Sequence, residues 1–310
     1  MEVLYKSILS TFAYFDIFSH PLTAEEVHSF ANCTCTKNEI EEALNELAYR
    51  EVLFKCGKFY ATNSVETLVA KRLKANAVAE KQIASAERIA KFLSHIPFVK
   101  GVALSGSLSK KIATEKSDFD FFIITSKNRL WISKLLFSFV TKTAGLLGKG
   151  KYFCLNYLID ETYLEVEEKN IFTATEIVTL LPLYGKKIFT DFFSKNEWTL
   201  NCYPAKFTDL TAQEIKRSFA KRFSEWLLNI FGGNSLNNFL MRFFSKRWKK
   251  MLQQNKFMES GFQFGAMKVS KNFCRPYPEH FQKKILHIYQ QRFSFLKARM
   301  ENKMLLVVSE

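Results

Sequence analysis

Two short apolar runs, joined by a compact polar motif, constrain the fold of this chain most strongly. The first run, Val102–Leu104, leads into Gly106-Ser107 after a single serine, and the second, Phe121–Ile124, directly follows Asp118 and Asp120. Apolar runs of this length, bounded by Gly, Ser and Asp, are typical of buried strands. Because side chains at positions i and i+2 of a strand point to the same side, the two aspartates are expected to share one face where the second strand begins.

These residue types suit chemistry on phosphates with a divalent cation. Two carboxylates on one strand face are the hard oxygen ligands that Mg²⁺ uses while it keeps waters and substrate phosphates in its shell. Gly106 allows the backbone to come close to a phosphate, and Ser107 offers a hydroxyl and an N–H at the start of a short helix. Lys110 and Lys111 follow one helical turn later and are predicted to neutralise the β- and γ-phosphates.

The pattern around the motif predicts a mixed α/β unit, because apolar strand-like runs alternate with helical periodicity. A long helix over 65–95 leads into this unit. The elements expected after it are strand 98–104, a loop and helix over 106–114, strand 119–125, helix 128–147, strand 152–159, a short strand over 162–166 and a helix near 173–181.

Leu104-Ser-Gly-Ser-Leu108, together with Ser117-Asp-Phe-Asp-Phe-Phe-Ile-Ile124, resembles the signature of the DNA polymerase β-like nucleotidyltransferase superfamily. The resemblance extends over roughly residues 70–190. It implies a mixed sheet flanked by helices and a two-metal transfer of a nucleoside monophosphate from an NTP to an acceptor. It also implies that Asp118 and Asp120 are the catalytic Mg²⁺ ligands and that Gly106 and Ser107 lie at the triphosphate.

The third carboxylate that the family places on the next core strand is where this sequence departs from the pattern. Asn156 fits that position, and an amide oxygen can coordinate a metal but carries no charge and cannot act as a base. Asp160, on the same strand face, and Glu165, framed by two apolar residues, are the alternatives for a third acid. Two functions therefore stay open: transfer of a nucleotide to an unknown hydroxyl, or a catalytically weakened or inactive NTP-binding regulatory protein.

Residues 1–64 predict a winged-helix-like domain of three helices and a hairpin. Thr23 with Glu26, and Thr36 with Glu39, have the spacing of two helix-capping boxes. DNA binding by residues 1–62 is not favoured, because residues 1–60 hold nine acidic and five basic side chains and the expected recognition helix is itself acidic. Docking against the rest of the chain or against a protein partner is the preferred interpretation.

Positive charge gathers in the last third of the chain. Residues 211–300 carry 18 Lys or Arg against 4 Asp or Glu, within a net charge of +15 for all 310 residues. This excess predicts an anionic partner, either RNA or a phosphorylated small molecule that serves as acceptor. The side chains expected to contact it are Trp226, Arg247, Trp248, Lys249 and Lys250.

The chain is thus expected to be an α+β protein of three parts. These are the winged-helix-like domain at 1–64, a nucleotidyltransferase-like core at 65–205 and a basic, all-helical domain at 206–310. A cytoplasmic protein without a membrane partner is expected, because the longest apolar stretch, 130–147, is interrupted by Lys134 and Lys142 and the six cysteines are scattered.

Overall fold

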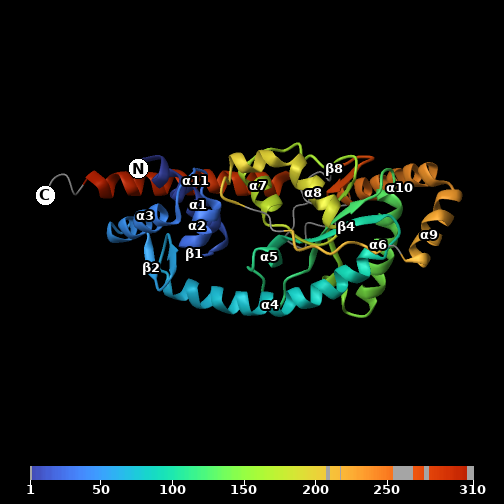
Figure 1. The fold of residues 1–310 in the computed structure, drawn as a ribbon, viewed down its shortest axis with the longest axis horizontal. Coiled ribbons are helices and arrows are strands. Elements are labelled where there is room, and N and C mark those ends of the chain that lie inside the picture. The colour runs from blue at the N-terminus through green and yellow to red at the C-terminus, as the bar shows by residue number, and fades with distance from the viewer. Residues whose placement is uncertain (1, 207–209, 217, 254–267, 276–278, 306–310) are drawn as a thin grey trace.

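The computed structural model describes residues 2–206, 210–216, 218–253, 268–275 and 279–305 (Figure 1). A unit of short helices lies at one end of the molecule, and a sheet with its own helices occupies the rest. The long helix α4 (Glu66–Ser94) runs from the first unit to the sheet, and the last helix, α11 (Glu279–Leu305), returns to the first unit. Among the described helices, none combines the length and the apolar character needed to cross a bilayer.

The sheet has six strands in the order β7-β4-β5-β6-β9-β8. Strands β5 and β6 are parallel, whereas the other neighbours are antiparallel, so the expected mixed sheet is confirmed. Its strands are β4 (Val99–Ser105), β5 (Asp120–Thr125), β6 (Cys154–Asp160), β7 (Leu181–Tyr184), β8 (Lys268–Val269) and β9 (Phe273–Arg275).

Alternation along the strands gives the sheet two buried faces. Val102, Leu104 and Ile123 belong to a cluster that includes residues of α4, α6 and α10, whereas Phe122 and Ile124 pack with residues of α7 and α8. Both faces are apolar because helices cover each of them, as expected for central strands. The remaining helices are α5 (Gly106–Ser109), α6 (Leu130–Leu146), α7 (Ile171–Val178), α8 (Lys186–Lys195), α9 (Phe219–Ile230) and α10 (Gly233–Gln253).

The first unit contains the three helices and the hairpin expected for it. They are α1 (Glu2–Phe15), β1 (Leu22–Thr23), α2 (Ala24–Phe30), α3 (Lys37–Tyr49), β2 (Phe54–Cys56) and β3 (Phe59–Ala61). Both predicted capping boxes form, with Thr23 capping α2 and Thr36 capping α3. Reciprocal capping bonds satisfy backbone groups that no helix can satisfy internally, which is why these two starts could be predicted.

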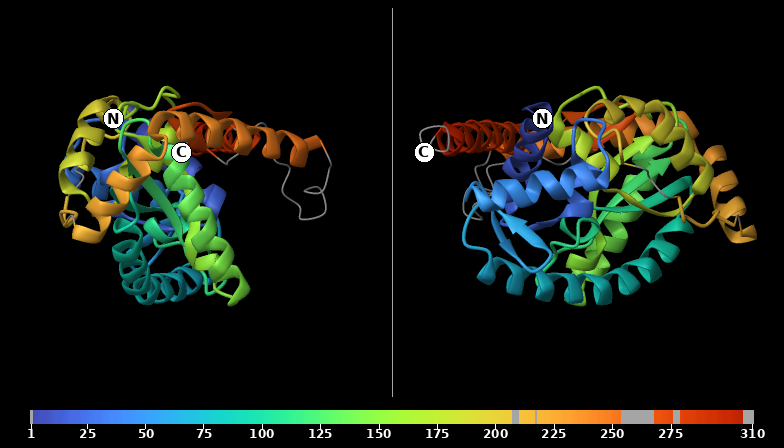
Figure 2. Two further views of the ribbon diagram at one scale, coloured as in Figure 1. Left: turned by 90° about the vertical axis from the view of Figure 1, so that its right-hand side faces the viewer. Right: turned by 60° about the vertical axis from the view of Figure 1, so that its left-hand side comes forward.

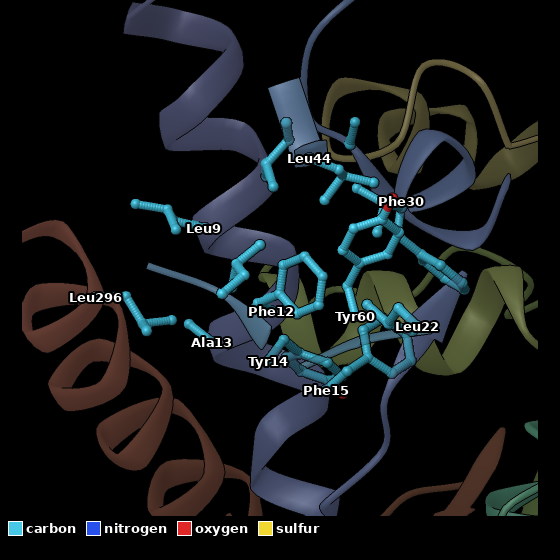
Figure 3. Packing of buried hydrophobic residues seen from close by; sticks show 14 of the residues in the cluster. Leu9, Phe12, Ala13, Tyr14, Phe15, Leu22, Phe30, Leu44, Tyr60 and Leu296 are labelled. Atoms are coloured by element: carbon cyan, nitrogen blue, oxygen red, sulfur yellow. The ribbon is translucent and has the colours of Figure 1, made fainter. Parts of the chain in front are cut away.

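Helix α11 belongs to the core of this first unit. Leu296 of α11 points toward Leu9 and Ala13 of α1 (Figure 3), and the Ser10 hydroxyl lies 2.8 Å from the hydroxyl of Tyr289. Since α1 is buried on nearly all sides, α2 and α3 alone cannot cover it. Residues 279–305, expected in the C-terminal domain, therefore complete a core at the other end of the chain.

Two of the elements expected from the sequence differ in the structure. Residues 162–166 form a loop, held by the Asn196 side chain, which accepts from Val166 N and donates to Leu164 O. The part after residue 206 is not all-helical, because β8 and β9 extend the sheet beside β6. An uncovered β6 edge would leave backbone donors and acceptors unpaired, and β9 satisfies them.

Arg72 of α4 joins the long helix to the first unit. Its side chain is buried, donates to Pro21 O and to the Glu26 carboxylate, and lies over the ring of Phe59. His20, which is also buried, sits beside this ion pair. Burial above all, and the nearby Arg72 charge, lower the pKa of His20 to about 4, against a smaller opposing effect of Glu26.

We expect this histidine to make the protein less stable in mild acid. A histidine whose pKa falls on folding contributes stability above its unfolded pKa of about 6.5 and loses it as pH falls toward the folded value. The contribution of His20 to the free energy of unfolding, taken as the wild-type value minus that of His20→Gln, should therefore drop by ~2 kcal/mol between pH 7 and pH 4.5. Denaturant unfolding of both proteins at each pH measures this difference.

The exposed His95 offers a matched control. His95→Gln should leave the loss of stability between pH 7 and pH 4.5 unchanged. An equal effect of both substitutions would refute the assignment to His20.

Candidate active site

A cavity of about 290 Å³ lies where the sheet meets the first unit. Gly106 and Asp120 line it from the ends of two strands, Asn156 from the next strand, and Phe18 and Phe281 from the first unit and α11. The motif predicted to carry the chemistry therefore opens into a space whose walls come from both ends of the chain.

The Asp120 carboxylate and the Gly106 turn lie in direct contact. Ser105 and Asp120 pair across β4 and β5, so the turn after β4 comes back over the first residue of β5. Gly106 has φ +69°, and a Cβ at this position would overlap Oδ2 of Asp120 and lie 3.1 Å from its Cγ. Glycine is required here for two reasons: the left-handed backbone and the space that the carboxylate occupies.

Burial shapes the acidity of Asp120. Removal from water raises its pKa to about 6, with a further upward contribution from Asp118, and a hydrogen bond from the Cys154 thiol opposes the shift. Asp118 is exposed at the entrance to β5, on the other side of the buried Phe119. The two predicted carboxylates thus sit close enough to interact, but Asp118 precedes β5 and is open to solvent, and of the two only Asp120 lines the cavity.

Lys110 lies at the cavity, whereas Lys111 does not. The Lys110 ammonium donates to Gly106 O at 3.2 Å and lies 2.8 Å from a carboxylate oxygen of Glu176, a residue of α7. Lys111 is exposed and does not belong to the cavity lining. Its backbone has φ +57°, so the chain leaves the helix direction there, because α5 ends at Ser109 and not near 114 as expected.

Glu176 is a cavity residue that the sequence pattern did not single out. It lines the cavity and is close enough to raise the pKa of Asp120. The sequence offers one signal for it: Glu176 is the single charged residue of α7, whose other residues are apolar or threonine. Its position beside Lys110 depends on how α7 packs on the sheet, which no local pattern encodes.

The three positions considered for a third acid have different locations. Asn156 lines the cavity and donates from Nδ2 to Ser105 Oγ at 2.9 Å. Asp160 is fully buried at the opposite end of β6, where it accepts from Asn128 N and Thr162. Glu165 is on the exposed loop, paired with Lys169. Neither alternative acid therefore reaches the cavity.

The carboxylates at the site fit Mg²⁺ as a two-ligand set. Asp120 is a partly buried carboxylate beside a second aspartate, and such a pair is stabilised by a divalent cation. Among the residues that the structure describes, no three His, Cys, Asp or Glu side chains are grouped to hold a metal. Mg²⁺ does not need three such side chains, because it commonly binds one or two carboxylates and completes its coordination shell with water and substrate phosphates.

The basic C-terminal residues expected at the acceptor lie elsewhere. Trp226, Arg247 and Lys250 are outside the cavity, and Trp248 packs against Trp131 with ring centroids 5.9 Å apart. The side chain of Lys249 lies outside the described residues. From residues 211–300, the cavity lining contains instead Arg275, Phe281 and Gln282.

Comparison with known proteins agrees with this geometry. Residues 86–197 match the family model described as "Nucleotidyltransferase domain". The matched segment contains β4, the Gly106 turn, β5, β6 and α7. This match agrees with the polymerase β-like resemblance of the sequence. No curated protein and no solved structure matches the chain.

Gly106→Ala is expected to displace the Asp120 carboxylate. The new Cβ would force this side chain away, so Mg²⁺ affinity measured by calorimetric titration should fall by about tenfold to a hundredfold. The strained left-handed backbone should also cost ~1–2 kcal/mol of unfolding free energy.

Gly148→Ala separates the two effects. Gly148 has nearly the same φ, +70°, but no heavy atom lies within 4 Å of the position that a Cβ would occupy there. This control should lose similar stability while keeping its Mg²⁺ affinity. Equal Mg²⁺ affinity in the two variants would contradict the role assigned to the Gly106–Asp120 contact.

Proposed function

We propose that the nucleotidyltransferase domain transfers a nucleoside monophosphate from an NTP to a hydroxyl acceptor. In this reaction a bond forms between the acceptor oxygen and the α-phosphorus, and the bond from that phosphorus to the oxygen of the leaving pyrophosphate breaks. The hydroxyl proton passes to a base. The observation that carries this proposal is the Asp120 carboxylate enclosed against the Gly106 turn at the cavity.

The residues around the turn receive distinct roles. Asp118 and Asp120 would hold Mg²⁺, which neutralises phosphate charge and activates the acceptor oxygen when bound. Gly106 and Ser107 would face the triphosphate, because both line the cavity at the end of β4. Lys110 would neutralise a phosphate, since its buried ammonium is anchored beside the same turn.

Glu176 is proposed as the base in place of a third aspartate. Asn156 cannot accept the proton, and Asp160 and Glu165 lie away from the cavity. The Glu176 carboxylate is held by Lys110 at 2.8 Å. Phosphates that bind Lys110 compete for this ammonium and release the carboxylate, which couples arrival of the nucleotide to availability of the base.

The cavity favours a phosphorylated small molecule over RNA as the acceptor. Among the described residues of 211–300, the cation that lines the cavity is Arg275. Its guanidinium donates to the side chains of Glu168 and Gln282 and lies over the Tyr157 ring. A single oriented guanidinium among apolar walls suits one phosphate group better than a nucleic-acid strand.

The protein is proposed to act in the cytoplasm.

The first unit is proposed to form a wall of this site and to contact protein, not DNA. Phe18 of this unit lines the cavity, and α7 packs into the same core. The acidic side chains Glu39, Glu41 and Glu42 are exposed on α3, the helix that would have to approach DNA.

A regulatory NTP-binding protein is the second candidate, and Asn156 is the observation that favours it. An amide at this position keeps a metal ligand and a hydrogen bond to Ser105 but removes a negative charge from the site. Such a site would bind nucleotide with little or no turnover.

Labelled-nucleotide assays distinguish the two functions. With Mg²⁺, each NTP labelled at the α-phosphate, and phosphorylated small molecules that carry a hydroxyl group as acceptors, the wild-type chain should bind nucleotide and release pyrophosphate as the label joins the acceptor. Asp120→Asn should lower Mg²⁺-dependent binding at least tenfold, because it removes the enclosed ligand charge. Glu176→Gln should keep binding and lower turnover by about a hundredfold or more.

Glu165→Gln is the matched control, since it makes the same change on the exposed loop. It should leave binding and turnover unchanged. Nucleotide binding without pyrophosphate release, under all four NTPs, would favour the regulatory protein; absence of nucleotide binding would overturn both candidates.

A further inference from the structure

Helix α9 attaches to the body of the protein by its polar side. The Lys221 ammonium is buried and donates to Ser94 O and Val99 O, both at 2.7 Å. One turn later, the Glu225 carboxylate accepts from Phe98 N at 2.8 Å. These bonds satisfy backbone groups where α4 ends and β4 begins, so charged side chains hold the helix in place.

The apolar side of α9 consequently faces solvent. Phe219, Phe223, Trp226 and Ile230 follow one another at helical spacing, and Phe219 and Trp226 are 83% and 56% exposed. Three of these four side chains are aromatic rings in a continuous stack, with centroids 6.3 Å apart between Phe219 and Phe223 and 5.8 Å apart between Phe223 and Trp226. This orientation is the reverse of that in an ordinary surface helix, which buries its apolar stripe.

The next helix also exposes apolar side chains. Phe231 follows directly after α9, and α10 exposes Phe239 and Phe243, while Leu240 and Phe244 of α10 are buried against the sheet unit. Large exposed apolar surfaces of this kind mark interaction sites in soluble folded proteins. We call Phe219, Phe223, Trp226, Leu227, Ile230, Phe231, Phe239 and Phe243 the α9–α10 surface.

Cations accompany this surface, and the nearby acids are bound to the protein body. The exposed basic residues of the two helices and the segment before them are Lys216, Arg222, Arg242, Lys246, Arg247 and Lys250. Between residues 211 and 253 the acids are Glu214 and Glu225, which accept from Lys187 N and from Phe98 N. The charge that accompanies the apolar side chains is therefore positive.

The α9–α10 surface lies away from the first unit and from the cavity. Figure 1 shows α9 at the end of the molecule opposite the first unit, and the right-hand view of Figure 2 shows it at the edge of the molecule again. The described cavity-lining residues come from other elements. A large partner on this surface would leave the cavity accessible.

We propose that the α9–α10 surface docks on an anionic lipid bilayer, with the two helices lying in its interface. Aromatic and aliphatic residues on one side of a helix, flanked by Lys and Arg, are what an interfacial helix needs to insert shallowly and to attract anionic headgroups. Trp226 suits the depth at which indole rings partition. This proposal of peripheral binding departs from the expectation from the sequence that no membrane is involved.

Two other occupants fit this surface less well. A second copy in a symmetric contact would set the same cations against one another. Single-stranded RNA would meet the cations, but the rings of Phe219, Phe223 and Trp226 stack on one another, and Leu227 and Ile230 offer bases no ring face.

Vesicle binding by the full chain tests the proposal. Flotation with phosphatidylcholine vesicles containing about 30% phosphatidylglycerol should recover the protein, with a blue shift of tryptophan emission, and pure phosphatidylcholine should bind at least about tenfold more weakly. Phe223→Ser/Trp226→Ser should reduce binding to anionic vesicles at least about tenfold. Arg242→Gln/Lys246→Gln should weaken binding to anionic vesicles and reduce its dependence on salt.

Tyr49→Ser is the matched control, because Tyr49 is 89% exposed but lies in the first unit. It should bind vesicles as the wild type does. Circular dichroism and thermal melting should show that each variant is folded, as expected for changes at exposed side chains. The proposal is overturned if the wild type does not bind anionic vesicles, or if Phe223→Ser/Trp226→Ser abolishes self-association or RNA binding while vesicle binding stays unchanged.

Discussion

The close approach of the Asp120 carboxylate to the Gly106 turn is the constraint on which the site depends. It requires β4 and β5 to be antiparallel neighbours with Ser105 opposite Asp120, and it requires a residue without a side chain after β4. Once these two strands are paired, the turn, the buried carboxylate and Lys110 are all placed at one end of the sheet. A carboxylate enclosed in this way is costly to ionise unless a cation joins it.

The cavity at this end of the sheet exists because the two ends of the chain meet there. Helix α11 completes the core around α1, and α7 packs into the same core while it carries Glu176 toward Lys110. Phe18 and Phe281, more than 260 positions apart in the sequence, line one space. The first unit and the nucleotidyltransferase domain are therefore linked through the walls of the site, and a change in how they pack would alter the cavity.

Elements with strong local signals were predictable. The capped helices α2 and α3 and the apolar strands β4, β5 and β6 lie close to their expected positions, because capping bonds and apolar runs are encoded within a few residues. The loop at 162–166 was mistaken for a strand because Leu164 and Val166 alternate with polar residues, yet Asn196 holds them from outside the segment. The expected strand also placed Glu165 among the possible third acids. Glu176 was not singled out because its position beside Lys110 depends on how α7 packs on the sheet.

The orientation of α9 is a feature that the sequence alone does not predict. The periodicity of α9 identifies an amphipathic helix, and the residues of the Gly106–Asp120 motif likewise define their own chemistry. Which side of α9 is buried was decided by Lys221 and Glu225, whose bonds to Ser94, Val99 and Phe98 cross more than 120 positions. Local backbone preferences and hydrophobic spacing are properties of neighbouring residues, so they can be read along the chain. The partner of a buried charge, and the side of a helix that stays in water, depend on contacts between distant segments and follow only from the folded arrangement.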